Sequence, residues 1–266
     1  MSVRVYTGPH SDRGGGPSGW ISYLPWALAG LTILGQITWV PLGSGGRTVL
    51  TALTVVTFFL SSATHAFITR GAAWASGYLA ISLVFGWGIE FLGLQTSFPF
   101  GEYAYSDALG PSVGGVPVVI PMAWAMMAYP VLLAAQRLSA TGLGTALVGG
   151  WLLASWDLFL DPQMVGQGYW TWADAGWALP GIPGIPLQNF LGWLLGAIVL
   201  MFLLDRLPRK VASEAVPTLM LTWVFASNVV ANLLFFDRPG VALWGGLCMG
   251  VVIAPWLWRL WSQPQW

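Results

Sequence analysis

Three carboxylic acids lie within strongly apolar stretches of the sequence: Glu90, Asp157 and Asp161. An ionisable side chain is costly in a hydrocarbon environment, so each of these acids is a candidate functional group. Asp157 and Asp161 are four residues apart, which places them on one face of a helix. One buried carboxylic acid can protonate a substrate while a second carboxylate takes a proton from water. The three acids therefore indicate proton-transfer chemistry with divided acid and base roles.

Four amide side chains are expected near the same end of the molecule as the acids. Gln188 and Asn189 begin one apolar stretch, and Asn228 and Asn232 lie four residues apart on another. Such amides can hold a reacting water. They can equally cap a helix or form hydrogen bonds between membrane helices.

Tryptophan is abundant, with 18 residues in the chain. Many of them fit the aromatic belt at membrane interfaces. Four are expected to lie near the acids: Trp87, Trp124, Trp156 and Trp193. Aromatic faces stabilise cations, so these rings could shield a carbocation, although packing alone would also account for them.

The composition defines the elements that must position these residues. Charged residues make up 8% of the 266-residue chain, against about 25% in soluble domains. Hydrophobic residues make up 56%. These values exclude a soluble globule and a disordered chain, and ten scattered basic residues exclude a nucleic-acid binder. The fold class is therefore an all-α, polytopic transmembrane helix bundle.

Apolar stretches near the length needed to cross a bilayer recur along the chain. They predict eight helices, at about 20–40, 48–69, 72–94, 116–136, 143–161, 187–205, 215–236 and 240–260. Residues 1–19 are interpreted as a mobile cytoplasmic tail, and residues 20–266 as a single transmembrane domain. Pro162 is expected to end the fifth helix directly after Asp161.

The basic residues predict the orientation of the bundle. Eight of the ten fall on the side that carries both termini: Arg4, Arg13, Arg70, Arg137, Arg206, Arg209, Lys210 and Arg259. Arg47 and Arg238 fall on the other side. The positive-inside rule then predicts a protein of the cytoplasmic membrane with both termini inside and with long outer loops at about 95–115 and 162–186.

The two long loops resemble each other. Residues 101–107 and 168–174 both read Gly-x-aromatic-x-aromatic-x-Asp, displaced by 67 positions. The same displacement relates Glu90 to Asp157, and a Gly-x-Pro segment precedes Trp124 and Trp193 at the same spacing. We interpret these matches as a parallel internal repeat, helix-loop-helix, over about 72–136 and 143–205. An axis along the membrane normal would place both acids around a shared centre.

Several chemistries lack their sequence signatures. No dinucleotide fingerprint, Walker loop or nucleophile elbow is present, and one cysteine with two histidines gives no metal-ligand spacing. The Asp157-x-x-x-Asp161 pair is also found in Mg-diphosphate sites, but the predicted outer half has almost no Lys or Arg to hold a diphosphate. We therefore expect no cofactor and no metal, and a substrate without phosphate.

The motifs resemble the membrane carotenoid-biosynthesis proteins of the CruF type, most clearly over about 85–195. The segments that carry the resemblance are Glu90-Phe91-Leu92-Gly93, Phe98-Pro99-Phe100-Gly101-x-Tyr103-x-Tyr105, Gly115-x-Pro117-x-x-x-Pro121-x-x-Trp124, Trp156-Asp157-x-x-x-Asp161-Pro162 and Pro186-x-x-Asn189-Phe190-x-Gly192-Trp193. The resemblance implies a carotenoid 1,2-hydratase, which adds water to the terminal double bond of an acyclic carotenoid end. Its substrate would be lycopene, γ-carotene or a C50 precursor, with membrane lipid and other carotenoid-pathway enzymes as partners.

Hydration of an alkene needs a proton and then water, and this chemistry suggests roles for the acids. Glu90 is expected to act as the acid and Asp157 as the base that orients water, with Asp161 in support; the exchange of Glu90 and Asp157 fits nearly as well. The residues expected to bind substrate or water are Trp87, Trp124, Trp156, Asn189, Asn228, Asn232, Tyr103 and Tyr105. Two alternatives stay open, namely a carotenoid- or lipid-binding or transport protein without catalysis, and an end-group cyclase.

Overall fold

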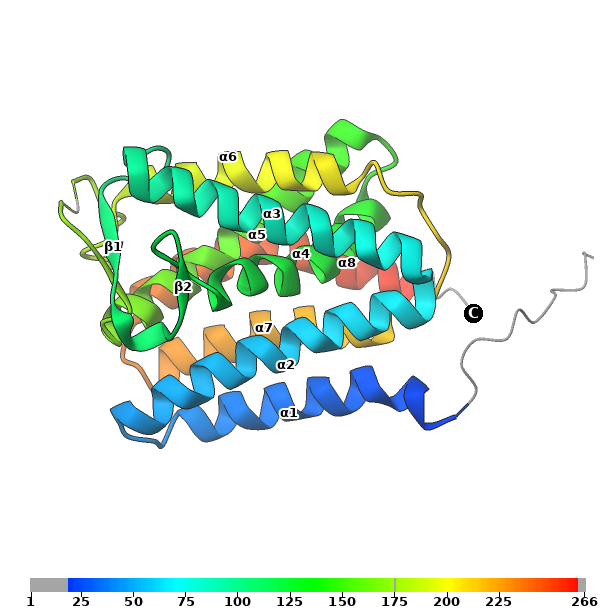
Figure 1. Cartoon of the computed structure of the whole chain (residues 1–266), viewed down its shortest axis with the longest axis horizontal. Coiled ribbons are helices and arrows are strands. Elements are labelled where there is room, and N and C mark those ends of the chain that lie inside the picture. Colours follow the sequence, from blue (N-terminus) through cyan, green and yellow to red (C-terminus); the bar gives the residue numbers. More distant parts are fainter. Residues whose placement is uncertain (1–18, 175, 263–266) are drawn as a thin grey trace, which may run out of the picture.

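The computed structural model describes residues 19–174 and 176–262, and within these ranges eight helices are long and apolar enough to cross a membrane. They run alongside one another in a single bundle (Figure 1). Their bounds are α1 (Leu24–Trp39), α2 (Ser44–Arg70), α3 (Ala72–Thr96), α4 (Val119–Leu138), α5 (Gly142–Gly166), α6 (Leu187–Leu204), α7 (Ala215–Leu234) and α8 (Pro239–Ser262). Each predicted span corresponds to one of them, which confirms an all-α, multi-pass membrane bundle.

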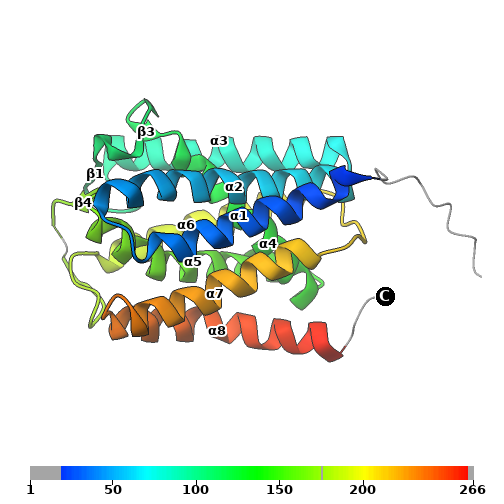
Figure 2. The same ribbon diagram turned by 90° about the horizontal axis from the view of Figure 1, so that it is seen from below.

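The two ends of the bundle differ. A short 3-10 helix, η1 (Trp20–Tyr23), precedes α1, and η1 lies at the same end as the last turn of α8 (Figures 1 and 2). We call this the termini end. The long connections 97–118 and 167–186 lie at the opposite end, which we call the loop end. The tail predicted for residues 1–19 lies, apart from Gly19, outside the described residues.

The outward faces of the helices are apolar. Large aliphatic side chains that are more than half exposed recur on them, among others Leu31, Leu34, Val84, Leu243 and Val251. Soluble proteins rarely expose apolar surface on this scale, whereas a lipid environment favours it. The polar groups described below are buried within the bundle instead.

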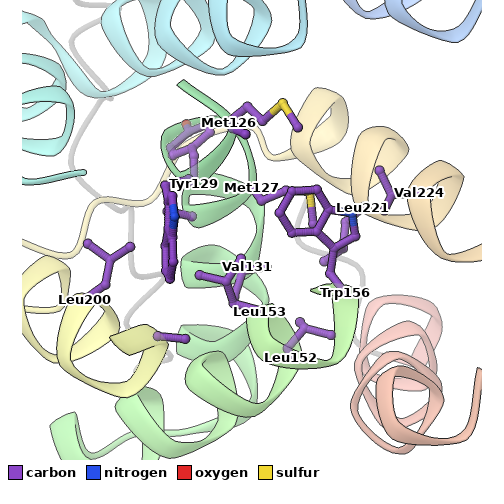
Figure 3. Close-up of a cluster of buried hydrophobic side chains, with 14 of the residues drawn as sticks. Met126, Met127, Tyr129, Val131, Leu152, Leu153, Trp156, Leu200, Leu221 and Val224 are labelled. Atoms are coloured by element: carbon purple, nitrogen blue, oxygen red, sulfur yellow. The ribbon is translucent and has the colours of Figure 1, made fainter. Parts of the chain in front are cut away.

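Helix α4 forms the centre of the bundle. Nearly all of its side chains between Ala123 and Ala135 are buried, which is expected of a helix that is apolar on every side. Figure 3 shows Met127 and Val131 of α4 packed among side chains of α5, α6 and α7. This central helix also carries Trp124, which reaches the candidate site.

Helices α5 and α6 approach each other closely because glycine lies at their contact. A Cβ atom on Gly150 would lie 2.8 Å from both the Cα and the N of Ile198. Small residues at helix contacts allow this kind of close backbone packing in membranes. The contact fixes the position of α6, which begins with residues of the site.

The loop end carries two small antiparallel sheets. Strand β1 (Tyr103–Tyr105) pairs with β4 (Trp170–Trp172), and β2 (Ser112–Val113) pairs with β3 (Val116–Pro117). A short 3-10 helix, η2 (Asp107–Leu109), joins β1 to β2. The pair β1–β4 crosses the ends of the helices and connects the two long loops (Figure 1).

The structure has the two-unit organisation that the repeat predicts. Units α3–loop–α4 and α5–loop–α6 are joined at residues that the displacement of 67 relates, since Ala104 lies directly opposite Thr171 in the β1–β4 pair. The related Trp124 and Trp193 stack on each other, with ring centroids 4.1 Å apart and planes inclined by 3°. Both contacts join residues that the repeat makes equivalent, as expected if an approximate twofold axis relates the two units.

One expected helix end was wrong. Pro162 does not terminate α5, which continues through it to Gly166. A proline removes one N–H from a helix, but membrane helices tolerate this where neighbouring groups supply hydrogen bonds. The hydrogen bond that Pro162 lacks is the one to the carbonyl of Leu158. A separate bond, from Arg238 Nη1 to the carbonyl oxygen of Pro162 at 2.7 Å, holds the last turn of α5 against the chain that precedes α8. Asp161 therefore lies inside a helix and is not a cap at its end.

Candidate active site

Glu90, on α3, is the centre of a set of convergent hydrogen-bond donors. Its side chain is buried, and the hydroxyls of Tyr103 and Tyr105 donate to its Oε2 at 2.6 and 2.7 Å. The indole Nε1 of Trp124 donates to its Oε1 at 3.0 Å. Three donors fix the carboxyl group in one orientation and stabilise its charged form once a proton has left.

Strand β1 explains why two tyrosines reach the same carboxylate. Side chains two residues apart on a strand share a face, so Tyr103 and Tyr105 both point toward α3 while Ala104 between them is exposed. Burial, and then the neighbouring Glu90 carboxylate, raise the pKa of both tyrosines. Both hydroxyls therefore remain protonated and act as donors.

The two aspartates of α5 form a pair that a single amide joins. Asp157 and Asp161 are 1% and 3% exposed, and Asn189 at the start of α6 is 2% exposed. Asn189 Nδ2 donates to Asp157 Oδ2 at 3.0 Å and also to Asp161 Oδ2. Trp170 Nε1 of β4 donates to Asp161 Oδ1 at 3.0 Å. Two carboxyl groups this close together in a buried site repel each other when both are ionised, so the amide and indole donors are needed to hold the pair in place.

Glu90 and Asp161 line the same cavity, which we call the acid cavity. Its volume is about 60 Å³, enough for about two water molecules. Its polar lining groups are Glu90, Asp161, Asn189, Tyr103, Tyr105 and Thr51, and its aromatic wall includes Trp124, Trp193, Trp170 and Trp172. Asp157 does not line this cavity and lies behind Asp161 and Asn189.

A much larger groove adjoins the acid cavity. Its volume is about 840 Å³, and residues of α1, α2, α4, α5 and α7 line it. The five residues that line both spaces are Thr51, Val55, Met126, Leu160 and Met164. The groove therefore leads to the acids, and its size is in the range of pockets that bury whole organic ligands.

Some of the expected site residues lie elsewhere. Trp87 stacks on Phe91 and donates to the carbonyl of Val113, away from the acid cavity. Asn228 and Asn232 donate to backbone carbonyls of their own helix, at 2.8 and 2.9 Å. Short polar side chains often make such intrahelical bonds. These two amides lie at the loop end like the acids but do not line the acid cavity, and their expected role in holding substrate or water stays a prediction.

Two of the expected residues line the groove, and one residue that was not expected contacts an acid. Trp156 lines the groove, and its ring meets the edge of Trp193 with centroids 6.1 Å apart. Asn228 also lines the groove. Trp170, by contrast, was not singled out from the sequence, although its indole contacts Asp161. The repeated Gly-x-aromatic-x-aromatic segment contained the signal for it, because Trp170 is the counterpart of Tyr103.

The side chains that could bind a metal ion do not cluster in the described part of the chain. Within the described residues no group of three or more His, Cys, Asp or Glu side chains is arranged to hold a metal ion. His65 lies toward the termini end of α2, where its Nδ1 is 2.8 Å from the hydroxyl of Tyr129.

Comparisons with known proteins agree with the sequence motifs. Residues 47–258 match the family described as carotenoid biosynthesis protein. The bisanhydrobacterioruberin hydratase of Haloarcula japonica is 34% identical over 131 residues, which cover 46% of this chain and 42% of that protein. This similarity thus spans less than half of the relative's length. No solved structure matches the chain.

The family match includes every residue of the acid cavity and nearly all of the groove, and it covers most of the chain. The resemblance to CruF-type proteins is thereby confirmed, and the protein belongs to the carotenoid biosynthesis protein family.

Proposed function

We propose that this protein is a carotenoid hydratase that adds water across the terminal 1,2 double bond of an acyclic carotenoid end. The observation that carries the proposal is the acid cavity, in which Glu90 and Asp161 share one small space at the end of a large apolar groove. A relative whose printed name is a hydratase supports the same reaction type.

The groove suits a long apolar substrate. Its lining is mainly aliphatic and aromatic, and the five residues that line both spaces form its boundary with the acid cavity. A polyene chain could lie in the groove with its terminal double bond at the boundary that the groove shares with the acid cavity, facing the acids. The burial of the chain would supply binding energy away from the reacting carbons, which helps to orient the terminal double bond.

The first chemical step would be protonation of the alkene. Glu90 delivers a proton to C2, the double bond opens, and positive charge forms on the tertiary C1. The donors from Tyr103, Tyr105 and Trp124 would stabilise the carboxylate that remains. Electrostatic stabilisation of the developing charges is strongest in a dry site.

The stacked rings of Trp124 and Trp193 could protect the cation. Both rings line the acid cavity, so an aromatic surface and not bulk water would face C1. Cations within about 6 Å of an indole ring are attracted by its face. The same wall limits the number of waters that can reach the cation.

Capture by one water would complete the reaction. The water oxygen forms a bond to C1, one O–H bond breaks, and the aspartate pair takes the proton, with Asp161 on the cavity side. A proton returned from the pair to Glu90 restores the starting state. The site then carries the same net charge before and after the reaction, and no cofactor is needed. The exchange of acid and base roles would give the same product.

The distribution of Lys and Arg between the two ends of the bundle supports an orientation in the membrane. In the described part of the chain, Arg70, Arg137, Arg206, Arg209, Lys210 and Arg259 belong to the termini end, and Arg47 and Arg238 to the loop end. We propose that the termini end faces the cytoplasm and that the bundle lies in the cytoplasmic membrane. The acid cavity would then lie in the outer half of the bilayer.

Expression in a host that makes lycopene or γ-carotene tests the proposal. We expect a more polar pigment, heavier by one water, with an unchanged visible spectrum, on reverse-phase chromatography with mass detection. A pigment of unchanged mass and shifted absorption would establish a cyclase instead. Unchanged pigment that copurifies with the protein, in this host and in a C50-precursor host, would establish a binding protein.

A further inference from the structure

A second, smaller cavity lies behind the aspartate pair. Its volume is about 20 Å³, which is enough for about one water molecule. Its polar lining groups are Asp157, Asp161 and Asn189, and the other lining residues are Leu158, Pro162, Leu179, Ile182, Ile185, Pro186, Leu187 and Phe190. Asp161 and Asn189 also line the acid cavity, so these two side chains form the wall between the two spaces.

Asp157, which lines this second cavity, has a buried oxygen without a hydrogen-bond partner among the described residues. Its Oδ2 accepts from Asn189, whereas its Oδ1 is fully buried and has no hydrogen-bond partner in the described part of the chain. A buried carboxyl oxygen without a partner is costly, and native structures rarely leave one unsatisfied. Asp157 lines the second cavity and not the acid cavity. A single water in this cavity would satisfy Oδ1.

The second cavity lies beneath the segment 177–187, which we call the cap segment. Ile182 of this segment is buried at the cavity, whereas its neighbours Gly181 and Pro183 are exposed at the loop end. Trp244 of α8 fixes the segment by donating to the carbonyl of Pro180 at 2.9 Å. The cap segment therefore lies between the cavity and the surface of the loop end.

The cavity and the groove are reached from different sides. None of the residues that line the groove also lines the second cavity. The groove meets the acids through α2 and α4 together with Leu160 and Met164 of α5. The second cavity meets them through Asp157 and the cap segment. Two reactants could therefore approach the acids along separate paths.

We propose that the second cavity is the binding site of the water that is consumed in the reaction, supplied through the cap segment from the aqueous phase at the loop end. This inference rests on the hydratase function proposed above. The water binds to Asp157 Oδ1 and passes Asp161 and Asn189 to reach the cation. Its oxygen bonds to C1, and its proton goes to the aspartate pair. The carotenoid arrives separately, through the groove.

Nucleophile competition tests this path, because the cavity has room for water but not for methanol. Membranes that contain the protein are supplied with carotenoid in water–methanol mixtures, and the alcohol and methyl ether products are separated by mass. We expect wild type to form the alcohol and very little ether. Ile182→Ala should raise the ether-to-alcohol ratio at least about tenfold, since one methyl group decides between ligands by about that factor in a tight pocket.

Two further variants keep the result interpretable. Leu179→Ala enlarges the same cavity from a half-buried position and should raise the ratio even if Ile182→Ala fails to fold. Val113→Ala removes an exposed aliphatic side chain at the loop end, away from the cavity, and should leave the ratio at the wild-type value. A wild-type ratio in both enlarged variants, with hydration intact, would overturn the water path alone. A wild-type protein that forms neither product would overturn the proposed function itself.

Discussion

Replacement of Glu90 by glutamine separates a catalytic role from a structural one. The substitution keeps the size of the side chain and an oxygen that can accept from Trp124. It places an NH₂ group where the hydroxyls of Tyr103 and Tyr105 donate, and those hydroxyls can rotate to accept instead. The variant should therefore fold, at a cost of about 1–3 kcal/mol for the hydrogen bonds that lose their charged partner.

The effect on turnover should be far larger. An amide cannot deliver the proton that starts the reaction, and general acids contribute about 10²–10⁴ in rate. At about 1.4 kcal/mol for each factor of ten, this corresponds to about 3–5 kcal/mol of lost transition-state stabilisation. Because every later step depends on this proton, we expect Glu90→Gln to lie at the upper end of the range.

The assay compares initial rates of alcohol formation in membranes, together with the amount of pigment that copurifies. Glu102→Gln is the matched control, because Glu102 is exposed on the same loop as the two tyrosines. We expect wild-type rates for Glu102→Gln, and for Glu90→Gln a loss of rate with pigment binding retained. Wild-type turnover in Glu90→Gln would refute the acid role. Loss of both pigment binding and turnover would instead make Glu90 a positioning residue.

Three further substitutions test separate parts of the argument. Tyr105→Phe removes one donor to Glu90, the proposed acid, and should lower turnover about 10- to 100-fold at unchanged pigment binding, since one hydrogen bond to a charged group contributes about 1.5–3 kcal/mol. Ser227→Trp fills the groove and should raise the carotenoid concentration needed for half-maximal rate, whereas Leu233→Trp, on the same helix but outside the groove, should not. Gly150→Ala introduces a methyl group at the α6 backbone and should lower the free energy of unfolding by about 1–3 kcal/mol in detergent, whereas Gly88→Ala, which has open space, should be neutral or stabilising.

Hydropathy was sufficient to predict the eight helices, because the bilayer requires long apolar segments whatever their neighbours. The prediction was less accurate at helix ends, where tertiary contacts decide. Pro162 is the clearest case: α5 continues through it to Gly166, and the last turn of α5 is held by Arg238, 76 positions away in the sequence, which donates to the carbonyl of Pro162. Similarly, Val116 and Pro117 pair with β2, so α4 begins three residues later than predicted.

The candidate site was predictable where it depended on the repeat. The displacement of 67 associated Glu90 with Asp157, and the pairing of β1 with β4 brings the two loops together at equivalent residues. Rotation of α7 was not predictable in the same way. Asn228 and Asn232 lie at a suitable depth, but their side chains bond to their own helix backbone. The sequence contained no information on that rotation, because α7 lies outside the repeat.

The groove could not be inferred from the sequence at all. Its lining comes from five helices, and most of the lining residues are ordinary apolar residues with no distinctive spacing. A cavity depends on what fails to fill the space between helices, and this follows from the packing of the whole bundle. Only Thr51 and Thr54 interrupt the apolar face of α2 there, and threonines in membrane helices commonly bond to their own backbone, as these two do.

The approximate twofold axis suggests how one scaffold provides both an acid and a base. Duplication alone would place two equivalent carboxyl groups around the axis, with equivalent surroundings and the same tendency to hold a proton. The two units carry different residues at related positions. Tyr103 in the first unit corresponds to Trp170 in the second, and Leu94 corresponds to Asp161. The first unit therefore surrounds a single acid with hydroxyl donors, whereas the second holds an aspartate pair that one amide joins, with one oxygen that has no hydrogen-bond partner among the described residues. Because proton donation and water capture need different surroundings, this asymmetry between related units is what the proposed hydration requires.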